Sequence, residues 1–144
     1  MGVRINELRI NGLRIMKYKS FEELPVWRDA VEVGKEIYLL TNAGKFEKDY
    51  TLKEQIRKAV ISISSNIAEG FERSNNNEFI RFLLIAKGSV GEVRSQLYLS
   101  FILGYIDKNV FDKFNSKLKV LVKQIGSFTS YLKNQKLGGK FLNK

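Results

Sequence analysis

The chain contains a single proline, Pro25, and after it apolar residues recur every three or four positions almost to the C-terminal end. Because proline interrupts helix interiors, a chain with one proline and long spans free of turn signals can form long uninterrupted helices. No segment shows a competing strand pattern. We therefore predict an all-α fold, an antiparallel up-down-up-down four-helix bundle that occupies residues 21–134.

Four segments carry an apolar stripe with helical spacing. In the second, for example, Ile56, Val60, Ile63 and Ile67 fall in one arc. The predicted helices cover about 24–41, 51–72, 77–103 and 107–134.

Polar residues mark the ends of these helices. Thr51 and Glu54 form a capping box at the start of the second helix, and Asn75 with Glu78 begins the third in the same manner. The polar, glycine-broken sequence of residues 135–144 predicts a flexible basic tail.

The N-terminal segment has a different character. Residues 4–15 read as a five-residue repeat, which fits the period of neither a helix nor a strand, so residues 1–20 are predicted to form a disordered basic extension. Met16 follows the repeat and could be the true start of translation. The alternative function for this segment is a basic arm that contacts nucleic acid.

Charge is distributed unevenly along the chain, whose net charge is +10. Residues 1–20 carry +4, residues 21–106 carry −1, and residues 107–144 carry +7. Basic ends around a neutral centre favour a polyanionic partner such as RNA. The alternative is a lysine-rich helix face that serves only solubility.

The chain has no cysteine and no histidine. Disulfides, thiolate nucleophiles, histidine dyads and the Glu-x-x-His metal motif of helical bundles are therefore excluded. We predict no enzymatic activity, no cofactor and no metal site. No apolar run is long enough to span a membrane, and the first 20 residues lack the apolar core of a signal peptide, so we expect a cytoplasmic protein.

A row of polar side chains runs beside the core stripe of the second helix. Its members are spaced by four, three and four residues, so each can reach the next. We name this row the polar ladder: Ser62, Asn66, Glu69 and Arg73. It either is buried and sets helix register or subunit contacts, or is a solvated face with weak pairs.

The third helix has a second uncharged face opposite its core stripe. We name it the outer stripe: Leu84, Gly88, Gly91, Ser95, Leu99 and Ile102. Each glycine inside a helix costs about 1 kcal/mol relative to alanine, and close approach of another helix would compensate for that cost. We predict that the outer stripe is a subunit contact; the alternative is a crowded core within one chain.

Several motifs together resemble a known family. They are SNIAEG at Ser65–Gly70, EFIRFL at Glu78–Leu83, and Gly88-Ser89 ahead of Glu92 and Gln96. Over about residues 21–132 the sequence resembles the bacterial four-helix-bundle proteins encoded in intervening sequences of 23S rRNA genes. The resemblance implies a homo-pentamer and a fold related to the accessory proteins of diversity-generating retroelements, which bind nucleic acid and a reverse transcriptase. It implies no catalytic residues.

Two functions follow as alternatives. The first is an oligomeric protein that binds RNA or other nucleic acid through basic surfaces, mainly by phosphate contacts. Its candidate residues are Lys113, Lys117, Lys119, Lys123 and Lys133, followed by Arg57, Lys58 and Arg81. The second is a scaffold that self-assembles and binds a protein partner. Most aromatic residues lie in core stripes, which predicts few platforms for base stacking.

Overall fold

A computed structural model of the chain describes residues 5–10 and 13–138, with side chains described for residues 18–135. The elements follow in the order β1 (Ile5–Ile10), β2 (Leu13–Tyr18), η1 (Phe21–Glu23), α1 (Pro25–Thr41), α2 (Gly44–Lys48), α3 (Tyr50–Glu72), α4 (Asn76–Ile102) and α5 (Lys108–Gly138).

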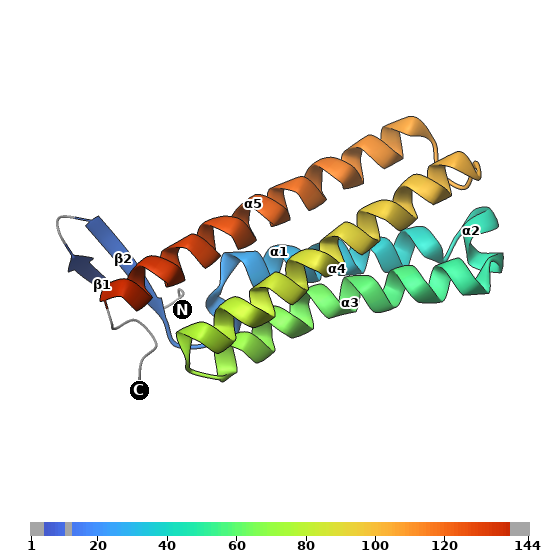
Figure 1. Cartoon of the computed structure of the whole chain (residues 1–144). Coiled ribbons are helices and arrows are strands. Elements are labelled where there is room, and N and C mark those ends of the chain that lie inside the picture. The colour runs from blue at the N-terminus through green and yellow to red at the C-terminus, as the bar shows by residue number, and fades with distance from the viewer. Residues whose placement is uncertain (1–4, 11–12, 139–144) are drawn as a thin grey trace.

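The four long helices form the predicted bundle. Figure 1 shows that α1, α3, α4 and α5 run in alternating directions along one axis. The most extensive contact between helices is that of α3 with α4, followed by that of α4 with α5. α1 packs on α3 and, less extensively, on α5. The apolar stripes meet between the helices, where Ile37, Ile63, Leu83 and Ile125 are completely buried. The all-α four-helix fold is thus confirmed.

Side-chain caps begin three of the long helices. The Asn75 Oδ1 accepts a hydrogen bond from the Glu78 backbone N–H at 3.0 Å, as the cap prediction requires. At α3 the cap is Asp49, whose Oδ1 accepts from the Leu52 N–H at 3.0 Å. The predicted Thr51 capping box is therefore wrong, because an aspartate two residues earlier already satisfies the first turn.

Two other boundaries differ from the prediction. The expected loop 42–49 contains the one-turn-and-a-half helix α2, anchored by the buried ring of Phe46. The expected tail is helical as far as Gly138, so its first four residues extend α5. Helix propensity continues through Gln135, Lys136 and Leu137, and α5 is described as far as Gly138. Residues 139–144 lie outside the described part of the chain.

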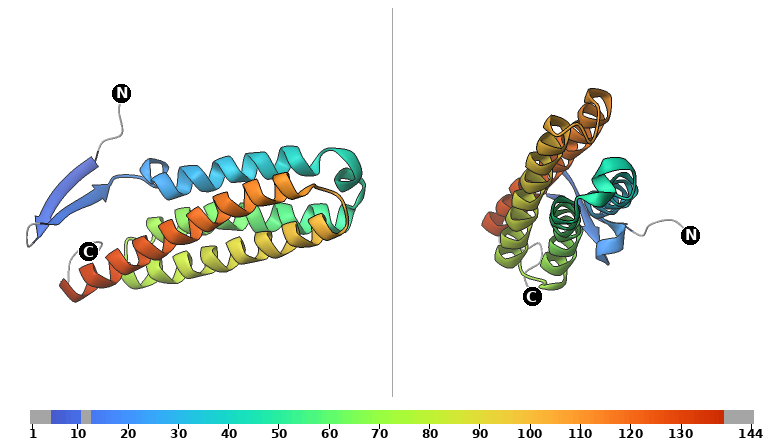
Figure 2. Two further views of the ribbon diagram at one scale, coloured as in Figure 1. Left: turned by 90° about the horizontal axis from the view of Figure 1, so that it is seen from above. Right: turned by 90° about the vertical axis from the view of Figure 1, so that its right-hand side faces the viewer.

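The predicted disordered extension is corrected for residues 5–10 and 13–18. These form an antiparallel hairpin in which Leu8 pairs with Ile15 and Ile10 pairs with Leu13. The sequence places Asn11-Gly12 between the two strands, and this dipeptide flanked by apolar residues is the strongest local signal for a hairpin. Figure 2 shows the hairpin projecting beyond the end of the bundle.

α3 and α4 are in close contact at Gly70. A Cβ atom at this position would lie 2.7 Å from the Phe82 Cβ and 2.9 Å from the Phe79 Cδ1. Such distances are shorter than van der Waals contact, so only glycine allows the two helices to cross here. Gly70 is buried within α3 and does not end it.

Candidate functional site

The first half of the polar ladder lies between helices. The Ser62 Oγ accepts hydrogen bonds from the Asn66 Nδ2 at 2.9 Å and from the Ser89 Oγ of α4 at 2.8 Å. Asn66 also donates to the Ser62 backbone carbonyl at 2.8 Å. Ser89 is buried and the other two side chains are half-buried, so this part of the ladder joins α3 to α4.

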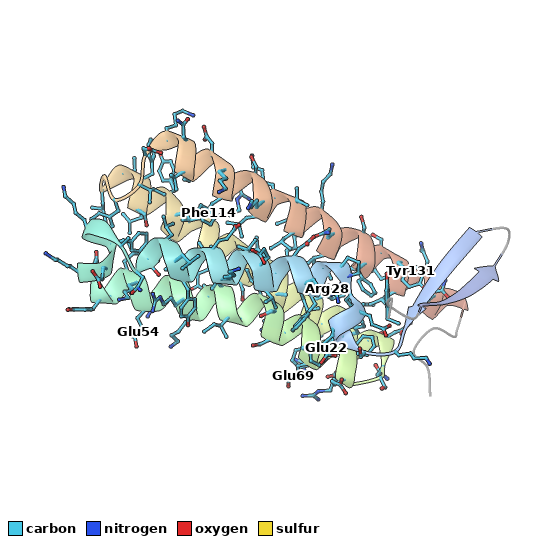
Figure 3. The ribbon with its side chains drawn as sticks, turned by 180° about the vertical axis from the view of Figure 1, so that it is seen from behind. Glu22, Arg28, Glu54, Glu69, Phe114 and Tyr131 are labelled. Atoms are coloured by element: carbon cyan, nitrogen blue, oxygen red, sulfur yellow. The ribbon has the colours of Figure 1, made fainter. Side chains whose placement is uncertain are left out.

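The second half of the ladder is exposed. Arg73 donates to Glu69 at 3.0 Å, with both side chains about half accessible to solvent. The structure shows no hydrogen bond between Asn66 and Glu69, both of which are described, so the predicted row is two separate pairs. Figure 3 shows Glu69 on the outer surface of the bundle. Each of the two alternatives therefore holds for one half of the ladder. Ser62 and Asn66 form an interhelical contact, whereas Glu69 and Arg73 form an exposed pair on a solvated face.

The outer stripe of α4 is exposed to solvent in the single chain. Leu84, Leu99 and Ile102 are 50%, 47% and 59% exposed. Nothing lies within 4 Å of a Cβ atom built at Gly88 or Gly91. The alternative of a crowded core within one chain is therefore wrong, and the stripe is an open uncharged surface.

The predicted basic residues of α5 fall into two classes. Lys117 donates to both carboxylate oxygens of Glu36 on α1, at 2.8 and 2.9 Å, so its charge is already neutralised. The other four are exposed and make no ion pair within residues 18–135, where side chains are described: Lys113, Lys119, Lys123 and Lys133. These four remain free to bind phosphate.

The remaining basic candidates lie on α3 and α4. Arg57 donates through Nε to the Thr41 Oγ1 at 2.9 Å and through Nη2 to the Tyr38 carbonyl at 3.2 Å. Arg81 pairs with Glu78 at 3.1 Å, and this hydrogen bond lowers the pKa of the Glu78 carboxyl below its ordinary value. Lys58 is exposed and forms no pair with the described side chains.

The groove between α1 and α5 holds a hollow of about 530 Å³, lined by Val26, Val120 and Phe128 among others. Tyr18 and Tyr131 also line it. Burial, with a smaller effect of nearby Tyr18, raises the pKa of Tyr131 to about 12. Burial and the adjacent Glu23 raise the pKa of Tyr18 as well. At neutral pH both phenols are uncharged.

Among the described residues three tyrosines are exposed, a small number, as expected from aromatic residues that lie mostly in core stripes. Tyr50 is 76% exposed, Tyr98 is 55% exposed and Tyr38 is 39% exposed. Helical periodicity did place Tyr38 beside the core stripe, but Tyr50 precedes the first apolar position of α3 and belongs to no stripe. The sequence signal for an exposed ring is an aromatic residue that lies outside every apolar stripe, and Tyr50 is such a residue.

Within residues 18–135, where side chains are described, no group of three or more acidic residues is arranged to hold a metal ion. Glu69 of α3 and Glu92 of α4, two carboxylates on separate helices, are both exposed. Among the described helices, none combines the length and apolar content of a membrane span.

The structure is thus that of a four-helix-bundle protein, with an open uncharged stripe on α4 and exposed lysines on α5. The chain belongs to the 23S rRNA-intervening sequence protein family, whose model matches residues 22–127. The resemblance noted in the sequence is thereby confirmed.

The fold is similar to that of a solved structure. It is a protein of unknown function from the S23 ribosomal protein family of Bacteroides thetaiotaomicron VPI-5482, with a TM-score of 0.66 and 23% identity. The match covers 72% of this chain and 97% of that one. A comparison with curated proteins gave no match.

Proposed function

We propose that this protein is a non-enzymatic, cytoplasmic homo-oligomer that associates with RNA or other nucleic acid through its basic surfaces. The observation that carries the proposal is the set of exposed lysines on α5 that form no ion pair among the described side chains. In a chain of net charge +10, such residues attract phosphate at long range and release counterions on binding. The name of the family, which refers to an intervening sequence of 23S rRNA, is consistent with an RNA partner.

The outer stripe supports the oligomer. It presents three large aliphatic side chains with two glycines between them, and a second helix can approach such a surface closely. The resemblance to the family favours a pentamer, which would carry five times the charge of one chain. The relationship to retroelement accessory proteins stays a prediction.

The experiment combines a binding titration with a mass measurement. Filter binding of RNA and of duplex DNA at two salt concentrations should show affinity that falls steeply with salt. Replacing Lys113, Lys119 and Lys123 by glutamine should weaken binding of both nucleic acids and flatten the salt dependence. Replacement of Lys117, which Glu36 already neutralises, is the matched control and should change binding less.

Mass in solution tests the assembly. Light scattering should give a multiple of 16.6 kDa for the unmodified chain and a smaller mass for Gly88→Leu, since the new side chain blocks close approach. Gly88 has open space around it in the single chain, so the substitution should leave the helical circular dichroism intact. A monomeric unmodified protein at tens of micromolar would contradict the oligomer.

A scaffold that binds a protein partner is the second candidate, and the open outer stripe favours it. Its prediction differs clearly: the unmodified protein would assemble but bind neither RNA nor duplex DNA at low salt. In that case the lysines of α5 serve solubility.

A further inference from the structure

The most exposed aromatic side chain among the described residues belongs to Tyr50, the first residue of α3. Its ring lies between two hollows at the α2 end of the bundle. One, of about 390 Å³, is lined by Tyr38, Lys53, Arg57 and others. The second, of about 600 Å³, is lined by Lys45, Lys48 and others. We name these two hollows, which share Tyr50 as a lining residue, the Tyr50 groove.

One cation of the groove is held in a fixed position. The Arg57 guanidinium lies 4.2 Å from the centre of the Tyr38 ring and donates to the Thr41 hydroxyl and the Tyr38 carbonyl. These contacts use only part of its five N–H donors. The remaining donors, on a side chain that is already ordered, can bind a phosphate oxygen at a small cost in conformational entropy.

Positive charge exceeds negative charge around Tyr50. Four exposed or half-exposed lysines form no ion pair among the described side chains: Lys45, Lys48, Lys53 and Lys58. Both oxygens of Asp49 are occupied, one by the Leu52 N–H at 3.0 Å and one by the Tyr105 hydroxyl at 2.8 Å. Glu47 and Glu54 form no ion pair among the described side chains, and Figure 3 shows Glu54 on the outer surface of α3.

We propose that the Tyr50 groove binds an unpaired stretch of nucleic acid, with a base stacked on the Tyr50 ring and the flanking phosphates on Arg57 and the lysines. This inference rests on the proposed function and assigns it a site. An exposed ring surrounded by cations is the arrangement that proteins use for single strands, whose bases present free faces. A duplex hides those faces in its stack, so the groove should discriminate between the two.

The test uses fluorescence anisotropy with a labelled uridine oligomer of about twelve nucleotides, within the site sizes known for single strands. Tyr50→Ala should weaken binding by about ten-fold, while Tyr50→Phe, which keeps the ring, should bind as the unmodified protein does. An oligomer of equal charge with abasic sites should bind the unmodified protein as weakly as the uridine oligomer binds Tyr50→Ala. The matching deoxythymidine oligomer and a hairpin duplex separate RNA from DNA and single from double strands.

Charge variants test the phosphate contacts. Lys53→Gln with Lys58→Gln should reduce the slope of log affinity against log salt by roughly 1.4, about 0.7 for each contact to a single strand. Glu54→Gln, which removes a negative charge from the same surface, should tighten binding. Lys113→Gln with Lys119→Gln is the matched control on α5: it should lower affinity for the uridine and abasic oligomers by the same factor.

Three outcomes would overturn the inference, and they are distinguishable. If the unmodified protein binds no nucleic acid, the proposed function fails and the inference fails with it. If it binds but Tyr50→Ala binds equally well, the function stands and the site is elsewhere. If Tyr50→Ala lowers the mass in solution, the groove is an interface between copies of this chain. Circular dichroism of each variant checks that the bundle is folded.

Discussion

The Ser89 hydroxyl of α4 donates to the Ser62 hydroxyl of α3 across 2.8 Å. The two residues are 27 positions apart in the sequence, and Ser89 is 8% exposed. Because Asn66 donates to the same oxygen at 2.9 Å, Ser62 is the acceptor at the centre of a small interhelical network. Buried polar groups of this kind require partners, so the network fixes how α3 and α4 align.

Ser62→Ala should destabilise the bundle by about 1–2 kcal/mol, since it removes the acceptor of the buried Ser89 hydroxyl. Urea denaturation followed by circular dichroism measures the loss. Glu69→Ala, which breaks only the exposed pair with Arg73, is the control and should cost a few tenths of a kcal/mol. If Ser62→Ala lowers the free energy of unfolding no more than Glu69→Ala does, the interhelical network adds no more to stability than an exposed pair.

Gly70→Ala should lower the free energy of unfolding by about 1–3 kcal/mol, because the new Cβ would overlap Phe82 and Phe79. The overlap has the larger effect, although alanine by itself favours a helix interior over glycine by about 1 kcal/mol. Gly126→Ala on α5 provides the matched control: its Cβ meets nothing within 4 Å, so it should stabilise the protein. A stabilised Gly70→Ala variant would mean that α3 and α4 are farther apart than described.

The stability of the protein should fall with rising pH between 10 and about 12 in part because of Tyr131. Its pKa is raised from 10.0 to about 12 in the folded state, so the unfolded chain loses this proton first. Ionisation of Tyr131 therefore favours unfolding in that window. The stabilisation that comes from keeping this phenol protonated is fully present below about pH 10.

Thermal melting of the unmodified protein and of Tyr131→Phe across this pH range measures the effect. The variant keeps the ring that packs on Phe128 but has no proton to lose, so its melting temperature should depend less on pH. Parallel curves would place the ionisation elsewhere, for example at Tyr18 or Tyr105, whose pKa values are also raised.

A chain that starts at Met16 should melt and assemble as the full chain does. It lacks β1 and the first three residues of β2 but keeps Tyr18, which packs against the core. The deletion removes Arg4, Arg9 and Arg14 together with Glu7, a net loss of two positive charges.

Three measurements on the full and shortened chains separate the possible roles of the segment. Equal melting, mass and RNA affinity would indicate a passive extension, and weaker RNA binding alone would indicate a basic arm. Loss of folding or assembly would show that the hairpin is part of the structural core.

Local sequence determined the helices of this protein. Apolar residues at helical spacing placed all four long helices, and the Asn75 cap was identified because it acts on a backbone N–H only three residues away. These features depend on backbone geometry within a few turns, which the sequence alone encodes. The hairpin was equally local, and its Asn11-Gly12 signal was present in the sequence.

Only the tertiary structure decided which polar and small residues have partners. Lys117 and Lys113 are alike in sequence, but Glu36, 81 positions from Lys117, neutralises one of them. Gly70 and Gly88 both lie inside helices, yet one is tightly packed and the other is open. These differences depend on the rotation and offset of each helix relative to its neighbours, which arise from packing of the whole core and leave no periodic trace in the chain.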